Sequence, residues 1–143
     1  MAILTKERLN GYGPFVDFYE RRPNGDTAHL GAWADSLIDV CCAITNQYLP
    51  FDPYFNGELD RRQMRILARD LYSWCSHLSF CRLDALDLEP LIDLYISNPP
   101  VDHPIYERAT ESLRTDLIDT VSFLASSIVL ALANGNRLVI DGI

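Results

Sequence analysis

Two pairs of aspartates are spaced so that a helix would place each pair on one of its faces. Asp35 and Asp39 are four residues apart, and Asp116 and Asp119 are three apart. Carboxylate oxygens are the ligands that hard divalent cations prefer, and two such pairs facing each other across a helical bundle can hold Mg²⁺ or Mn²⁺. One hypothesis is therefore a divalent-metal site. The other is that both pairs are solvated faces of amphipathic helices.

The residues around the second pair add a family resemblance to this hypothesis. The segment Thr115-Asp-Leu-Ile-Asp-Thr-Val-Ser-Phe-Leu resembles the E-x-x-D magnesium-binding helix of the all-α nucleotide pyrophosphohydrolases. The resemblance covers ten residues, with Asp116 where the family has glutamate, and the family's preceding E-x-x-E helix has no counterpart here. It implies an all-α fold, bound Mg²⁺ or Mn²⁺, and hydrolysis of nucleotides.

Other combinations of reactive side chains give weaker signals. Cys75, His77 and Cys81 lack the paired C-x2-C spacing of a structural zinc site. The three histidines fall in separate segments outside any nucleophile motif, and the chain has no glycine-rich phosphate loop. We therefore assign no catalytic residue and, outside the aspartate hypothesis, no cofactor.

Charge is unevenly distributed along the chain. The 143 residues carry 20 acids and 12 bases, for a formal charge of -8. This net charge argues against sequence-independent nucleic-acid binding by the whole protein and against docking on an anionic membrane. Residues 84–119 alone hold nine acids and two bases. We expect this segment to contact a basic surface of another protein, with candidate contacts Asp84, Asp87, Asp93, Glu107 and Glu111.

Two further clusters are candidate contact surfaces. One is a basic stripe on a predicted helix, in which arginines recur every four residues: Arg61, Arg62, Arg65 and Arg69. This stripe either pairs with the acidic segment or binds a separate acidic ligand. An aromatic loop either covers the end of the bundle or forms a hot spot for a protein partner; it contains Phe51, Tyr54 and Phe55.

The elements that would position these residues are predicted to be helices. Apolar spacing of three and four residues, with turn residues between the segments, predicts helices over 5–11, 14–22, 27–49, 56–78, 84–96 and 104–134, with Asn56 as a cap and Gly135 as a left-handed stop. The tail 137–140 is predicted to form an edge strand or to dock on the helices. The fold class is therefore all-α: one domain over 1–143, a compact bundle of four major helices with short N-terminal helices.

The last helix differs from the others because residues 117–133 are apolar almost all round. Its back face carries small or short side chains, which would let a second helix approach closely: Asp119, Ser122, Ser126 and Ala133. A helix of this type is normally buried on all sides. It is therefore predicted to be the central helix, to form a homodimer interface through 117–133, or to line a groove for a partner. The apolar stretch is shorter than the ~20 residues of a membrane span.

The start of the chain has no signal-peptide pattern, and the four cysteines do not have disulfide-framework spacing, which favours a cytoplasmic location. Size, acidity and the lack of a catalytic motif predict a small protein-binding module such as an adaptor, an inhibitor or an immunity-type protein. The alternative function is a divalent-metal-dependent nucleotide pyrophosphohydrolase.

Overall fold

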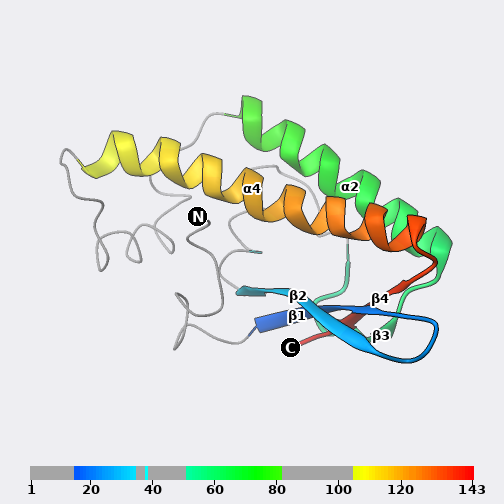
Figure 1. Cartoon of the computed structure of the whole chain (residues 1–143). Coiled ribbons are helices and arrows are strands. Elements are labelled where there is room, and N and C mark those ends of the chain that lie inside the picture. Colours follow the sequence, from blue (N-terminus) through cyan, green and yellow to red (C-terminus); the bar gives the residue numbers. More distant parts are fainter. Residues whose placement is uncertain (1–14, 35–37, 39–50, 82–104) are drawn as a thin grey trace.

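The computed structural model describes residues 15–34, 38, 51–81 and 105–143, with backbone alone for residues 34 and 105–113. In this part of the chain, four antiparallel strands form one sheet in the order β2-β1-β4-β3. Helices α2 (Arg61–Phe80) and α4 (Ile105–Ala133) both lie on one face of that sheet (Figure 1). The protein is therefore of the α+β class, and the prediction of an all-α helical bundle is wrong.

The predicted helix over 14–22 and the start of the predicted helix over 27–49 are replaced by a hairpin of β1 (Phe15–Arg21) and β2 (Thr27–Ala34). Val16 and Phe18 are buried while Phe15, Asp17 and Tyr19 are only partly buried, which is the period of two that a strand requires. The same short segment also satisfies helical spacing, so its periodicity is ambiguous over seven residues. The turn between the two runs resolves the ambiguity, because Gly25 takes a φ of 92° and lets the chain reverse.

The predicted helices over 5–11 and 84–96 lie outside the described residues, as does the remainder of the predicted helix over 27–49 except for residue 38.

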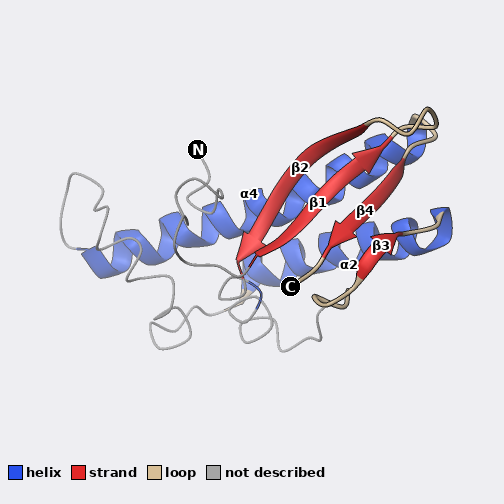
Figure 2. Cartoon of the chain, turned by 90° about the horizontal axis from the view of Figure 1, so that it is seen from below, coloured by secondary structure: helices blue, strands red, loops and turns tan. Residues whose placement is uncertain are grey.

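Strand β4 (Arg137–Asp141) is the predicted tail strand, but it does not lie at an edge. It pairs with β1 on one side and with β3 (Asn56–Glu58) on the other. Figure 2, which views the sheet from below, shows β4 between these two strands and both helices behind the sheet. The alternation of buried Leu138 and Ile140 with less buried neighbours is the pattern of a strand with one face on the core.

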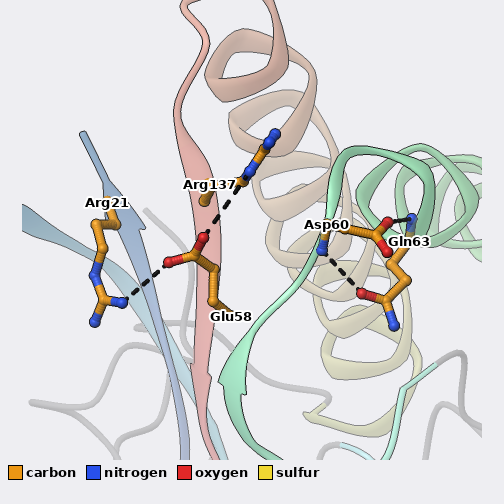
Figure 3. A network of polar contacts seen from close by, with 5 residues as sticks. All are labelled: Arg21, Glu58, Asp60, Gln63 and Arg137. Carbon is orange, nitrogen blue, oxygen red and sulfur yellow. Dashed lines mark hydrogen bonds and ion pairs between the residues drawn. The ribbon is translucent and has the colours of Figure 1, made fainter. Parts of the chain in front are cut away.

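Helix α2 forms close to its predicted range, but its N-cap lies four residues later than the predicted cap Asn56. The cap is Asp60, whose carboxylate accepts a hydrogen bond of 2.8 Å from the backbone N–H of Gln63. In return, the side-chain oxygen of Gln63 accepts a hydrogen bond of 2.8 Å from the backbone N–H of Asp60 (Figure 3). This reciprocal capping box satisfies two amides at the helix start. Asn56 and Gly57 instead pair with β4, which explains the later start.

Helix α4 matches its predicted range of 104–134, and Gly135 is the predicted left-handed stop, with a φ of 73°. The amides of Gly135 and Asn136 donate to the carbonyls of Leu132 and Ala131 at 3.2 and 2.8 Å. These bonds close the last turn of α4 and direct the chain into β4.

The hydrophobic core fills the space between the sheet and the two helices. Phe18 packs edge-to-face against Trp33 and Phe51, with ring centroids 5.4 Å apart in each pair. The helices contribute buried side chains along one side each, which include Met64, Leu71, Trp74, Leu78, Leu117, Val121 and Ile128. The core is thus one layer of side chains between one sheet face and one side of each helix.

Replacing Gly135 by alanine tests the turn from α4 into β4. Gly135→Ala is expected to lower the free energy of unfolding by about 1 kcal/mol, because a side chain is strained at positive φ. The matched control is Gly31→Ala in β2, where an added methyl also meets no atom within 4 Å and φ is ordinary; it should change stability by no more than about 0.5 kcal/mol. Equal losses in urea denaturation would contradict this account of the turn.

Candidate functional site

The side of α4 that faces away from the core carries exposed apolar residues. Phe123 is 59% exposed and Leu130 is 61% exposed. They belong to a stripe whose members recur at steps of four, three, four and three residues: Asp119, Phe123, Ser126, Leu130 and Ala133. This is the spacing of a seam that packs against another helix. The prediction that α4 is the central helix is therefore wrong, because its back face is exposed.

Helix α2 runs antiparallel beside α4, and two sets of contacts fix their register. At one end, Arg114 Nη1 of α4 donates to the carbonyl oxygens of Leu78 and Cys81 at 2.6 and 2.9 Å. A guanidinium there complements the negative end of the α2 dipole. Further along, Tyr72 Oη and Ser126 Oγ lie 3.1 Å apart, within hydrogen-bond distance. Figure 1 shows the two helices side by side over the sheet.

Because of this register, the exposed surface of the two helices carries basic residues at one end and an acidic residue at the other. We call it the outer helical face and define it by Arg65, Arg69, Tyr72, Asp119, Phe123, Ser126 and Leu130, all with exposed side chains. Tyr72, Phe123 and Leu130 form its apolar middle. Because the helices are antiparallel, Arg65 lies at the level of the last turn of α4, while Asp119 lies at the opposite end. The face is therefore basic at one end and acidic at the other.

A half-buried thiol lies behind this face, between the two helices. Cys75 Sγ is 3.9 Å from the carbonyl oxygen of Ile118. Burial raises the pKa of the Cys75 thiol to about 11, against the opposing effect of a backbone hydrogen bond. The thiol is therefore protonated near neutral pH and is not an activated nucleophile.

The structure places all four arginines of the predicted basic stripe on the exposed side of α2. Arg69 forms an ion pair with its neighbour Asp70 at 3.1 Å. Within the described residues, Arg61, Arg62 and Arg65 have neither an ion pair nor a hydrogen-bond partner for their side chains. The guanidinium groups of the stripe are thus presented to solvent along one edge of the outer helical face.

Most of the predicted acidic surface lies outside the described residues. This holds for Asp84, Asp87 and Asp93, while Glu107 and Glu111 lie on α4 where the backbone alone is described. Binding of a basic partner by this segment stays a prediction.

The two aspartate pairs are not brought together within the described part of the chain. Asp35 and Asp39 fall outside it, and Asp116 and Asp119 lie one turn apart on α4, with Asp119 exposed. Among the described residues, no group of three or more His, Cys, Asp or Glu side chains is placed to hold a metal ion. The all-α fold implied by the pyrophosphohydrolase resemblance is overturned by the sheet.

The aromatic loop does not present its three rings together. The ring of Phe51 stacks edge-to-face on Phe18, and Phe55 is half-buried against the core. Tyr54 is 69% exposed. Two of the three rings therefore cover the edge of the core, and Tyr54 is the one that faces solvent.

The stretch Arg114–Ala133 also meets the length and composition of a membrane span. Its mean hydropathy is 1.7, and 33% of it is buried; no other described helix meets these criteria. The core helix of a soluble protein passes the same test.

The sequence predicted a back face of small or short side chains at Asp119, Ser122, Ser126 and Ala133, of which all but Ser122 are exposed. It did not predict the exposed apolar residues beside them, which are Tyr72, Phe123 and Leu130. The steps of four and three through positions 119–133 were the available signal. Comparison with protein-family models, curated proteins and solved structures found no match to this chain.

Alkylation of Cys75 tests the packing of α2 on α4. Because the pKa of this thiol is about 11 in the folded protein, its reaction rate with iodoacetamide should rise about tenfold per pH unit between pH 8 and 10. The pKa of Cys75 in the folded protein exceeds the ordinary value of 9.0. The contribution of this thiol to the free energy of unfolding is therefore present below pH 9 and is lost as the pH rises toward 11. Peptide-resolved mass spectrometry measures the rate, and a plateau near pH 9 would contradict the buried position.

Proposed function

We propose that this protein is a small protein-binding module whose contact surface is the outer helical face. The observation that carries the proposal is the exposed apolar stripe of α4, with Phe123 and Leu130 each more than half exposed. Side chains of this size on one face of a helix lose contact with water only when another surface covers them, and their burial is favourable. Tyr72 on α2 lies within hydrogen-bond distance of Ser126 on α4, so the apolar area continues from one helix to the other.

The chemistry of the face specifies what can dock on it. Steps of four and three residues on α4 suit a second amphipathic helix, whose apolar side chains would pack beside Phe123 and Leu130. The arginines at one end call for acidic residues on the corresponding end of that helix, since guanidinium groups pair well with carboxylates. The expected partner is therefore a helix with an apolar stripe that continues into acids.

Helix α4 of a second copy of this chain has these features itself. A two-fold axis through Ser126 would lay Phe123 of one copy beside Leu130 of the other. The same operation would bring Arg65 to the level of Asp119 of the second copy, so opposite charges would meet at both ends. Such self-complementarity is the requirement for a two-fold symmetric dimer. A second copy is accordingly the occupant that we propose first, and a helix of a different protein is the other candidate.

A protein partner fits the face better than a bilayer does. The side of α4 opposite Phe123 carries core residues such as Leu117, Val121 and Ile128, so the helix cannot enter a membrane without leaving the sheet. Asp119 and the α2 arginines also border the apolar area, and burying their charges in hydrocarbon is costly. The net charge of -8 further disfavours an anionic lipid surface.

Sedimentation of the full chain over a concentration series tests this proposal. The wild-type protein should form a dimer, and Leu130→Glu should raise its dissociation constant by about tenfold or more, equivalent to at least ~1.4 kcal/mol, because a carboxylate would be buried in the seam. Tyr54→Glu is the matched control, since Tyr54 is equally exposed but lies outside the outer helical face; it should leave the constant unchanged.

A charge swap makes the same experiment specific to the two-fold arrangement. Arg65→Glu and Asp119→Arg should each weaken the dimer, and the double variant should regain most of the lost affinity, because its opposite charges meet again. A wild-type chain that is monomeric at every concentration would exclude the second copy as occupant. A double variant weaker than both single variants would contradict the proposed axis.

A further inference from the structure

The outer face of the sheet, on the opposite side of the molecule from the outer helical face, places two like charges against each other. Arg21 of β1 and Arg137 of β4 are direct cross-strand partners, and both side chains emerge on the face away from the core. Like charges directly opposite each other in an antiparallel pair are destabilising. Some negative charge must therefore offset this arrangement.

One carboxylate supplies part of that charge. Glu58 of β3 lies between the two arginines: its Oε2 accepts from Arg21 Nη1 at 3.0 Å, and its Oε1 is 3.9 Å from Arg137 Nε (Figure 3). A single carboxylate is thus shared by two guanidinium groups. Arg137 Nη1 is buried and has no hydrogen-bond partner within the described residues. A buried donor without a partner is costly, and such a donor in a native fold calls for an explanation.

These residues border a hollow at the end of the sheet. The hollow has a volume of about 320 Å³ and is lined by Arg21, Arg22, Pro23, Gly25, Glu58, Gly135 and Arg137. Three arginines and one glutamate are thus among the residues that line it. The two glycines contribute no side chain, and nothing lies within 4 Å of the position that a methyl group would occupy on either one. The hollow is therefore open to a ligand between two turns of the chain.

Two neighbouring acids have hydrogen-bond donors outside the hollow. Glu20 Oε1 accepts a 2.6 Å hydrogen bond from the Asn136 side chain, and Asp26 Oδ2 accepts one of 3.0 Å from the Asn24 side chain. Neither acid is part of the wall of the hollow. The residues that line the hollow therefore include three arginines against one glutamate, in a chain whose net charge is -8.

We propose that this hollow binds an oxyanion of the phosphate class, such as inorganic phosphate or the phosphate group of a small metabolite. Guanidinium groups bind phosphate oxygens through paired, charge-assisted hydrogen bonds, and Arg21, Arg22 and Arg137 approach from two strands and a turn. The volume accommodates a phosphate with a small organic substituent. The site is independent of the outer helical face, so either proposal can fail without the other.

Titration with inorganic phosphate, at an ionic strength held constant with chloride, tests the proposal on the full chain. The backbone amide signals of Gly25 and Gly135 should shift in a saturable way, because both residues line the hollow. Arg22→Gln should weaken phosphate binding by about fivefold or more, since it removes one guanidinium from an exposed turn. Arg62→Gln on α2 is the charge-matched control and should leave the binding constant unchanged.

A second variant changes binding in the opposite direction. The Glu58 carboxylate competes with phosphate for the Arg21 guanidinium and repels the anion. Glu58→Gln removes this carboxylate, so the affinity for phosphate should increase. Shifts that rise linearly without saturation would overturn the proposal by identifying an adventitious ion only. Equal losses in the Arg22 and Arg62 variants, or weaker binding after Glu58→Gln, would overturn it as well.

Discussion

The fold depends on β4, the strand that pairs with a neighbour on each side. Without it, β3 and the hairpin of β1 and β2 would not belong to one sheet. Its buried residues Leu138 and Ile140 also provide part of the surface on which the two helices pack. The turn at Gly135 connects this strand directly to the last residue of α4, so the position of the helix and the position of Arg137 are fixed together.

Because the described residues form two layers around one core, each layer has one face turned away from it. The outer helical face is apolar in its middle and charged at its ends, whereas the outer sheet face gathers arginines around Glu58. The physical chemistry of the two faces differs accordingly: the first favours exclusion of water by another helix, and the second favours an anion. Both proposed contacts leave the core undisturbed.

Helices α2 and α4 were predictable, whereas of the sheet only β4 was anticipated, as an edge strand. The side chains of α2 and α4 follow helical spacing over 20 and 29 residues, which is long enough to exclude other periods. Phe15, Phe18 and Tyr19 fit a helix as well as a strand because β1 has seven residues, and pairing with β4 from the far end of the chain decides between them. That long-range pairing leaves no local signal. The cross-strand pairing of Arg21 with Arg137 therefore could not be predicted from the sequence either.

The central claim is that another protein chain covers the outer helical face. The most direct measurement replaces Phe123 with a photo-cross-linking amino acid in the full chain, with the same replacement at exposed Tyr54 for comparison. The account predicts a covalent adduct from position 123, of twice the mass of the chain when the partner is a second copy, and none from position 54. No protein adduct from position 123, or equal adducts from both positions, would contradict it.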